Sequence, residues 1–428
     1  MRIGTVSLGC AKNQVDTEIM LGMLRRAGHE FVTDPAEAEV LIVNTCGFIE
    51  PAKEESINTI LEMAQYKAKG TCRKLVVTGC LAERYREDLR AEMPEIDILL
   101  GVREYEKLPL LLDRDAPDCR DAFRVLTTPP YRAYLRIGDG CSNRCTYCAI
   151  PLIRGGKQSL PEEVLIEEAQ RLADSGVTEL TCIAQDTSGY GTDLYGKPRL
   201  MDLLEKLSRI RSLHWIRVLY TYPDTVTPDV IDRMKAIPGV VPYLDLPIQH
   251  ADDAVLRRMN RRGSVRHLAE VMEHISRTAP DFMLRTTVMV GFPGETEEEF
   301  ENLMRFLREH PFDRVGAFAY SQEEGTPAAE MGGQIPEEVK RERLDRLMLQ
   351  QAEISLERNR KRIGTSAEVL IEGRRKDGTV LARSYAEAPD EADGWILLPK
   401  DRSKKAGSYH TVTLTGAGEY DLTGIWKE

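Results

Sequence analysis

The chain has 428 residues, of which 42% are hydrophobic and 30% charged, and this composition excludes an intrinsically disordered protein. Its formal net charge of −11 argues against a protein whose main task is to coat nucleic acid, because that task needs a basic surface. No apolar run approaches the roughly 18 residues of a membrane span, and the first residues lack the pattern of a signal peptide. We therefore expect a cytoplasmic protein with two or three domains.

The first hundred residues alternate apolar runs typical of buried strands with segments of helical periodicity. In chain order these are a strand at 3–8, a helix at 13–27, a strand at 40–43, a helix at 51–65, a strand at 75–77 and a helix at 81–91. Alternation of this kind predicts a parallel sheet with right-handed crossovers.

A polar, proline-marked stretch at 115–132 predicts a domain boundary, after which the alternation of strands and helices begins again. Six strands are predicted, at 134–137, 179–184, 215–220, 243–247, 284–290 and 315–320. Helices such as 162–174 and 297–309 lie between them, and a long charged helix at 336–360 follows. Six such units favour an incomplete (β/α)6 barrel of the TIM type over a closed barrel of eight.

The last 65 residues change to short alternating strands separated by Asp-Gly and Ala-Gly turns, which predicts a small antiparallel barrel. The predicted strands lie at 367–371, 379–383, 395–398 and 409–415. The fold class is thus α/β, with three expected domains at 1–118, 127–360 and 364–428.

Cys141, Cys145 and Cys148 form a C-x3-C-x2-C pattern. The chain has nine cysteines and no secretion signal, so metal binding or catalysis is a better explanation than disulfides. Three soft thiolates suit three irons of a 4Fe–4S cluster, and the fourth iron would be open to a substrate. Zinc is the alternative, but a structural zinc site takes four ligands, commonly in C-x2-C pairs.

Cys10, Cys46 and Cys80 each follow a predicted strand, with spacings of about one strand-helix unit. Because the carboxyl ends of parallel strands meet at one sheet edge, we expect these three thiols to converge on a second shared site. Any one of them could instead be a buried packing residue, as free cysteines often are. The other cysteines lack this placement and are predicted to be packing or surface residues: Cys72, Cys119 and Cys182.

A C-x3-C-x2-C loop after the first barrel strand, with aromatic Tyr147 before its last cysteine, resembles the radical S-adenosylmethionine (SAM) superfamily. Two three-cysteine sites followed by a small barrel resemble its methylthiotransferase family over essentially the whole chain. That family has an N-terminal methylthiotransferase domain, a radical SAM domain and a C-terminal TRAM barrel. The segments that carry the resemblance are 7–13, 44–49, 52–56, 148–155 and 383–389.

These segments are similar to the branch of the family that modifies an aspartate of ribosomal protein uS12, whereas the transfer RNA branch differs after the radical loop. One departure is the run Gln-Ser-Leu-Pro at 158–161, where the family tends to have a basic run.

The resemblance implies a division of labour between two 4Fe–4S clusters. The cluster on Cys141, Cys145 and Cys148 would cleave SAM to a deoxyadenosyl radical, which removes a hydrogen from the β-carbon of the target aspartate. The other, on the first cysteine set (Cys10, Cys46 and Cys80), would deliver a methylated sulfur, with the methyl group from a second SAM. Electrons would come from a flavodoxin or ferredoxin.

SAM also needs a pocket at the carboxyl ends of the barrel strands, where barrel enzymes build active sites. Five candidates lie there: Gly291, Pro293, Gly294, Gln185 and Gln249. A plain strand-to-helix turn would explain the glycines equally well, since a lone glycine pair is weak evidence. His250 is interpreted as a hydrogen-bonded structural residue rather than a ligand.

Two other functions compete with this one. The first is a transfer RNA adenosine methylthiotransferase, which belongs to the same enzyme class. The second belongs to another class and is a non-catalytic iron–sulfur redox sensor or RNA-binding protein. Residues 364–428 contain 9 basic and 11 acidic residues, which argues against a phosphate-binding barrel. A sensor would leave the presence of two open clusters in one chain unexplained.

An acidic run lies in the predicted loop after 379–383: Glu387, Asp390, Glu391 and Asp393. Ribosomal proteins are generally basic, so we expect this run to meet uS12 by charge complementarity. The alternative is an ordinary solvated loop.

Overall fold

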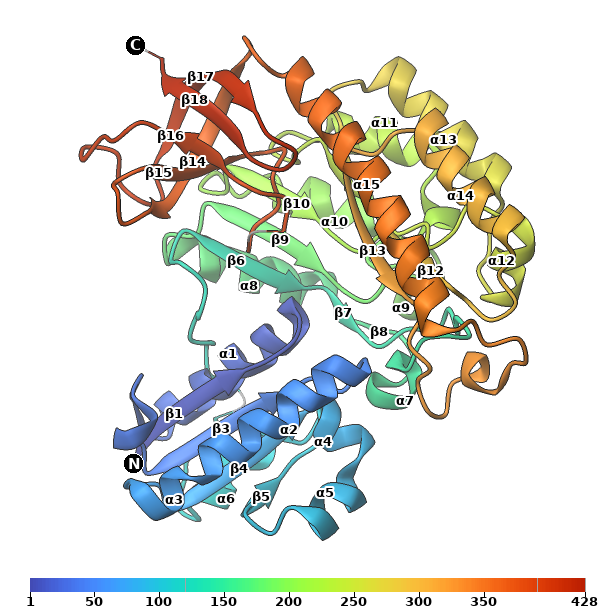
Figure 1. The fold of residues 1–428 in the computed structure, drawn as a ribbon. Helices are drawn as coiled ribbons and strands as arrows, with labels where there is room; N and C mark the ends of the chain where they lie inside the picture. Colours follow the sequence, from blue (N-terminus) through green and yellow to red (C-terminus); the bar gives the residue numbers. More distant parts are fainter. Residues whose placement is uncertain (120, 391, 428) are drawn as a thin grey trace.

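The computed structural model describes residues 1–119, 121–390 and 392–427 and contains three units (Figure 1). The N-terminal unit is a five-stranded sheet in the order β2-β1-β3-β4-β5, and every pairing in it is parallel, as predicted. Its strands are β1 (Arg2–Ser7), β2 (Glu30–Phe31), β3 (Val40–Thr45), β4 (Lys74–Gly79) and β5 (Ile98–Leu99).

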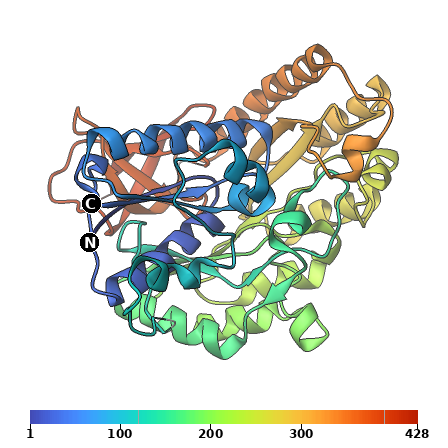
Figure 2. The ribbon, with the colours of Figure 1, turned by 90° about the horizontal axis from the view of Figure 1, so that it is seen from below.

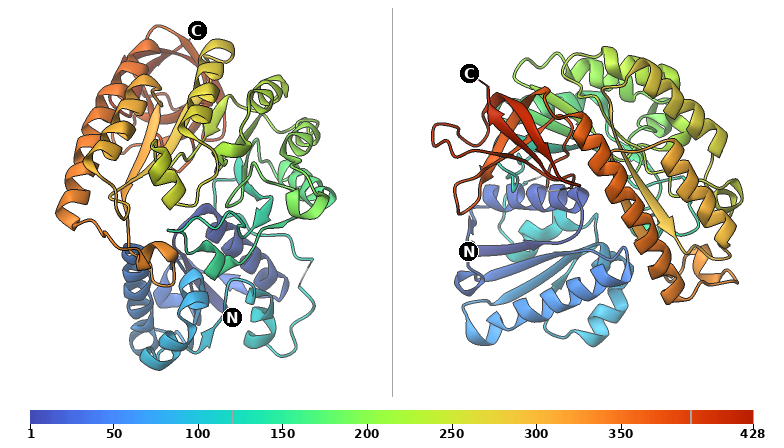
Figure 3. Two further views of the ribbon diagram at one scale, coloured as in Figure 1. Left: turned by 90° about the vertical axis from the view of Figure 1, so that its right-hand side faces the viewer. Right: turned by 45° about the horizontal axis from the view of Figure 1, so that its top comes forward.

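Helices cover both faces of this sheet because its strands are apolar on both sides (Figure 2). Val40 and Ile42 pack toward α1 and α6, whereas Leu41 and Val43 pack toward the opposite helices. Figure 3 shows α1 between its own sheet and the rest of the molecule, with α2 on the far side. The helices are α1 (Ala11–Arg26), α2 (Glu50–Ala64), α3 (Tyr66–Lys69), α4 (Cys80–Arg84), α5 (Arg86–Glu92) and α6 (Leu108–Leu112). The single helix predicted at 81–91 is therefore wrong, since Tyr85 leaves helical backbone geometry between α4 and α5.

The central unit has six strands in two parallel three-stranded sheets, β10-β9-β6 and β11-β12-β13. A hydrogen bond of 3.0 Å from the Val241 N–H to the Ile216 carbonyl joins the two sheets. This is the incomplete barrel that the sequence predicts. Its strands are β6 (Arg132–Arg136), β9 (Glu179–Ile183), β10 (Trp215–Val218), β11 (Tyr243–Asp245), β12 (Met283–Val290) and β13 (Arg314–Ala319).

The helices between these strands, together with the long helix after the last of them, form the outer layer (Figure 1). They are α8 (Glu162–Asp174), α9 (Thr192–Tyr195), α10 (Leu200–Leu207), α11 (Pro228–Ala236), α12 (Asp253–Arg258), α13 (Val265–Thr278), α14 (Glu297–Glu309) and the long α15 (Glu337–Lys361). The short α7 (Ile150–Arg154) and the strand pair β7 (Gly138–Asp139) and β8 (Gln158–Ser159) follow β6. No helix within the described part of the chain is both long and apolar enough to cross a membrane.

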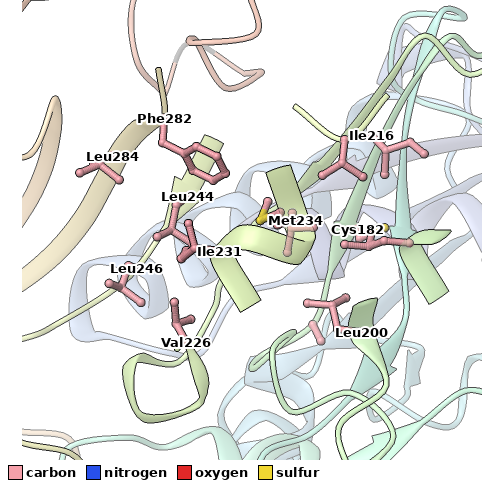
Figure 4. Close-up of a cluster of buried hydrophobic side chains, with 14 of the residues drawn as sticks. Cys182, Leu200, Ile216, Val226, Ile231, Met234, Leu244, Leu246, Phe282 and Leu284 are labelled. Atoms are coloured by element: carbon pink, nitrogen blue, oxygen red, sulfur yellow. The ribbon is translucent and has the colours of Figure 1, made fainter. Parts of the chain in front are cut away.

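A continuous apolar core lies between the barrel strands and their helices (Figure 4). Leu244 of β11 and Ile231 of α11 belong to it, and both are essentially inaccessible to solvent. Cys182 of β9 lies in the same cluster, while Cys72 and Cys119 are also buried. The three cysteines outside the two predicted sets are thus packing residues.

The C-terminal unit is a closed barrel in the order β14-β15-β16-β18-β17. Its strands are β14 (Ser366–Arg374), β15 (Val380–Ser384), β16 (Ile396–Leu398), β17 (Tyr409–Ala417) and β18 (Leu422–Trp426). The pairing of β16 with β18 is parallel and the other pairings are antiparallel, so one edge departs from the predicted arrangement. Strand β18 was not predicted, because Gly424 interrupts its short apolar alternation.

The segment that follows β15 turns inward and packs on the inner face of the central sheets. Ala386 and Ala388 share an apolar cluster there with Tyr243 and with Val15 of α1. The N-terminal and C-terminal units therefore both help to close the concave side of the open barrel.

The predicted acidic surface run is wrong for two of its four residues, Glu387 and Asp393. Glu387 is 1% exposed and bonds Arg362 at 2.5 Å, and Asp393 is 2% exposed and accepts a 2.5 Å hydrogen bond from Tyr243. Asp390 is exposed but pairs with Arg132 at 2.6 Å, and Glu391 lies outside the described residues. Burial raises the pKa of a carboxyl group, but Arg362 outweighs it and holds the pKa of Glu387 at about 2. Glu387 and Asp393 can be buried because each has a partner, and a charge run in a sequence does not reveal its partners.

Candidate active site

The first cysteine set lies at the carboxyl edge of the N-terminal sheet. Cys46 and Cys80 follow directly on the paired strands β3 and β4. Cys10 lies one residue beyond the matching position, because the pairing of β1 with β3 places Gly9 beside Cys46. A Cβ on Gly9 would lie 3.1 Å from the Sγ of Cys46, and its φ of 87° also favours glycine. The predicted common register is therefore right for Cys46 and Cys80 and wrong by one residue for Cys10.

The three thiols of this set lie within electrostatic range of one another. Burial raises the pKa of Cys80 to about 12, Arg154 opposes this shift, and Cys10 and Cys46 add to it. Thiols in such a place become thiolates only when a cation compensates them, and iron does so on coordination. The donor set and its placement therefore fit an iron–sulfur cluster.

Asn13 of α1 holds the strand ends that carry these cysteines. Its side-chain amide donates to the carbonyls of Leu8 (3.0 Å) and Thr45 (2.8 Å). Its Oδ1 accepts a 3.5 Å hydrogen bond from the Sγ of Cys80. From the other side, the fully buried Ser56 of α2 donates to the Cys46 carbonyl and accepts from the Cys46 N–H.

The second cysteine set lies in the loop between β7 and α7, and its backbone is fixed at several points. Cys141 N–H donates to the Gly155 carbonyl at 3.0 Å, and Cys148 N–H donates to the Cys145 carbonyl at 3.1 Å. Thr146 donates to the Met259 carbonyl at 3.0 Å, which ties the loop to the segment after α12.

A half-buried guanidinium lies against this loop. Arg261 reaches the Sγ of Cys145 at 3.9 Å, the hydroxyl of Tyr147 at 3.2 Å and the carbonyl of Pro247 at 2.6 Å. Burial raises the pKa of Cys148 to about 12, and Cys145 and Cys141 add to this effect. This set therefore has the same character as the first, and it too fits a cluster that supplies the compensating positive charge.

No group of three His, Cys, Asp or Glu side chains in the described ranges is spaced to hold a single metal ion. A four-iron cluster differs from a single ion in this respect, because each thiolate binds its own iron.

The SAM-pocket candidates divide between two surroundings. Gln185 donates to Asp139 at 2.9 Å, two residues before Cys141, and the other side-chain atom of Gln185 has no hydrogen-bond partner among the described residues. Gln249 lies four residues beyond the end of β11, with a φ of 67°. The structure thus places Gln185 beside the second cysteine set.

The turn after β12 has a packing role. A Cβ on Gly291 would press on Lys340 of α15, and Gly294 donates its N–H to the Gly333 carbonyl at 2.8 Å. Pro293 lies between these two glycines. His250 is fully buried 3.6 Å from Glu295, and neither ring nitrogen has a hydrogen-bond partner in the described part of the chain. The predicted hydrogen-bonded role of His250 is therefore not what the structure has.

Left-handed backbone at residues other than glycine occurs at five described positions, and four of them lie in loops of the central unit. Arg144, Tyr220, Gln249 and Asn260 all have positive φ values. Conformations of this kind are costly and concentrate at functional sites. Sequence reasoning missed this feature, and it also missed the roles of Asn13, Arg154 and Arg261, which have no local pattern.

Comparisons with known proteins assign all three units. The chain matches the uncharacterized protein family UPF0004 over residues 2–101, the radical SAM superfamily over 135–307 and the TRAM domain over 363–426. It is 49% identical to the protein named ribosomal protein uS12 methylthiotransferase RimO from Pelotomaculum thermopropionicum, over 99% of both chains. It is 48% identical to the protein of the same name from Heliobacterium modesticaldum, over 99% of this chain and 95% of the relative.

The chain belongs to the radical SAM methylthiotransferase family. It is an enzyme of that class, and an iron–sulfur cluster and SAM are the cofactors that accompany it. The radical SAM match spans Cys141, Cys145 and Cys148, and the UPF0004 match spans the first cysteine set.

Among solved structures, the radical SAM methyltransferase TsrM from Kitasatospora setae aligns with a TM-score of 0.56. The alignment covers 95% of this chain and 83% of TsrM at 13% identity. At that identity the likeness concerns the fold alone.

Proposed function

We propose that this enzyme inserts a methylthio group at the β-carbon of an aspartate of ribosomal protein uS12. The observation that carries the proposal is the closeness of the two cysteine sets. Cys148 is followed by α7, a helix of five residues that spans about 8 Å. Arg154 at its end reaches the Sγ of Cys80 at 3.7 Å. The names of the relatives at 49% and 48% identity support uS12 as the target.

Two clusters are part of this proposal, with one on each cysteine set. When bound, they supply the two difficult parts of the chemistry, which are radical generation from SAM and provision of a methylated sulfur. The chain itself positions them. Asn13 and Ser56 fix the strand ends of the first set, while Arg261 and the backbone of Thr146 fix the loop of the second.

We assign SAM contacts to the five candidates named from the sequence, Gln185, Gln249, Gly291, Pro293 and Gly294. Gln185 is the best supported, because it bonds Asp139 next to the second cysteine set. We further propose domains at 1–118, 127–360 and 364–428, a flavodoxin- or ferredoxin-type electron donor, and a cytoplasmic site of action, where a ribosomal protein would be met.

Mass spectrometry of uS12 and of bulk transfer RNA from a deletion strain tests the substrate. We expect uS12 to lose the mass of one methylthio group at one aspartate, and transfer RNA to remain unchanged. Loss of a methylthio group from transfer RNA with uS12 unaltered would refute the proposed target.

Iron content and product analysis test the division of labour. We expect about eight irons per chain after anaerobic reconstitution. Replacing Cys141, Cys145 and Cys148 with Ala should leave about half of the iron and abolish SAM cleavage. Replacing Cys10, Cys46 and Cys80 should also leave about half, with SAM cleavage intact and methylthio transfer lost. Equal loss of both activities in a folded first-set variant would contradict this scheme.

A further inference from the structure

Arg154 is a buried charge that joins the two cysteine sets. It is the last residue of α7, which begins two residues after Cys148, and Gly155 ends the helix with a φ of 72°. The Arg154 side chain is only 1% exposed. It enters the N-terminal unit, although its backbone belongs to α7 of the central unit.

The contacts of its guanidinium reach Cys80 of the first set and Asp139, just before the second set. One terminal nitrogen lies 2.6 Å from Asn13 Oδ1, 2.8 Å from Asp16 Oδ2 and 3.7 Å from the Sγ of Cys80. The other lies 3.2 Å from Asp139, two residues before Cys141. A planar fork with several donors can satisfy these partners together, which a lysine ammonium cannot.

The surrounding charges show what Arg154 compensates. Asp16 also pairs with Arg136, so the two arginines and the carboxylates of Asp16 and Asp139 balance formally. Burial opposes the charged form of Arg154, but Asp16, Cys80 and Asp139 outweigh it and raise its pKa. Without Arg154, the carboxylates of Asp16 and Asp139 would be left with one cation fewer.

We infer that Arg154 is a positioning residue that fixes the first cluster relative to the loop of the second cysteine set, and that it raises the reduction potential of the first cluster. This inference rests on the proposed function. Reduction of a cluster by one electron adds negative charge at thiolate ligands, and net charge and hydrogen bonds to the sulfurs set the potential. A fixed cation 3.7 Å from one ligand sulfur stabilises the reduced state.

The test is a redox titration of the full-length chain with Cys141, Cys145 and Cys148 replaced by Ala, so that iron remains on the first set alone. Dithionite supplies the electron, and electron paramagnetic resonance measures the reduced fraction. Arg154→Gln should lower the midpoint reduction potential of the first cluster by about 59 mV for one electron. At the parent's midpoint potential, the ratio of reduced to oxidised cluster should therefore fall about tenfold. Arg154→Lys should keep the midpoint near that of the parent.

Arg124→Gln is the matched control. Arg124 is also buried between the same two units, where it pairs with Glu18 and Glu168 at 3.2 Å and donates to the Tyr134 carbonyl; none of these partners is a cysteine. Its midpoint should equal that of the parent. Asp16→Asn is a second variant, for which we expect a shift in the opposite direction. Removing a carboxylate next to Arg154 should raise the midpoint reduction potential of the first cluster.

An unchanged midpoint in Arg154→Gln with its iron retained would overturn the inference, and so would an equal shift in the Arg124 control. If Arg154→Gln does not retain iron, an Asp16→Asn midpoint that fails to rise would overturn it as well. Failure of the proposed function has a different signature, since the unaltered enzyme would then leave uS12 unmodified. Absence of iron on the first set would remove the two-cluster proposal and this inference together.

Discussion

Asn13 shows how one uncharged side chain can shape a site for negatively charged ligands. Its two donors hold the carbonyls of Leu8 and Thr45, and its oxygen accepts from Arg154 and from the Cys80 thiol. An aspartate at this position would lose both donors and place a carboxylate against two carbonyls and a thiolate. The amide is therefore required for its hydrogen-bonding pattern and not for its size.

Asn13→Asp should lower the iron content from about eight to about four per chain, because the strand ends that carry the first set lose their alignment. SAM cleavage should persist, and methylthio transfer should fall to background. Iron analysis and deoxyadenosine measurement on the same preparation check this result. Asn143→Asp, which changes a hydrogen bond to Asp186 near the other set, is the control and should leave the first-set iron in place.

Glu387 contributes to stability through its depressed pKa. The difference between about 2 in the folded chain and its ordinary value of 4.5 corresponds to about 3 kcal/mol. A depressed carboxyl pKa stabilises the fold at neutral pH, and this contribution is lost as the pH falls below 4.5 toward 2. Glu387→Gln should therefore lower the melting temperature at pH 7, and the gap to the parent should narrow below pH 4.5. Glu357→Gln, at an exposed position of α15, should leave the melting temperature almost unchanged.

Both cysteine sets could be predicted from the sequence, because three thiols in one loop and three thiols after strands are local patterns. The contact of Arg154 with Cys80 could not be predicted, since it joins residues 74 positions apart in different units. Burial of Glu387 escaped prediction for the same reason, because its partner Arg362 stands outside the acidic run. Patterns of residue types at short spacing can be recognised in a sequence. Pairings that form only when separate units pack together cannot.

At the scale of elements, the parallel sheet and the open barrel follow from apolar strand runs, and helix α14 has the predicted limits of 297–309. Its start is well defined because Thr296 and Glu299 form a capping box. The prediction was wrong where a short element depends on its neighbours. Strand β18 closes a barrel by pairing with β16 and β17, and its own five residues carry only a weak signal.

Helix α7 separates Cys148 of the second set from Arg154, which contacts Cys80 of the first set, and a role as a spacer can be tested through its length. Inserting one alanine after Leu152 would rotate Arg154 by about 100° and move it by about 1.5 Å. Misplacement of this size can cost on the order of 100-fold in rate, so we expect product per deoxyadenosine to fall by about that factor. Deoxyadenosine formation itself should continue. An alanine inserted after Lys376, in the turn between β14 and β15, is the control; an equal loss there would refute the spacer role.

At the scale of the whole molecule, buried ion pairs join the three units. Glu323, in the loop after β13, bonds Arg84 at 3.0 Å and Lys53 at 3.2 Å in the N-terminal unit. Glu179 of β9 bonds Arg383 of the C-terminal barrel at 2.5 Å. Breaking such a pair from one side is costly because it leaves a buried charge without its partner. The units are therefore expected to unfold together and not one by one.

The C-terminal barrel is thus a structural part of the enzyme. Glu179 is fully buried between Arg217 and Arg383, and these arginines hold its pKa at about 2 against the effect of burial. A chain ending at residue 363 would lose Arg383 and also uncover the apolar cluster around Tyr243. Loss of one partner of a buried pair typically costs about 3–5 kcal/mol. We therefore expect the truncated chain to melt well below the full-length protein and to lose iron on heating at lower temperature. Arg383→Ala in the full-length chain should reproduce part of this loss, and a truncated chain as stable as the parent would show that the barrel is an independent appendage.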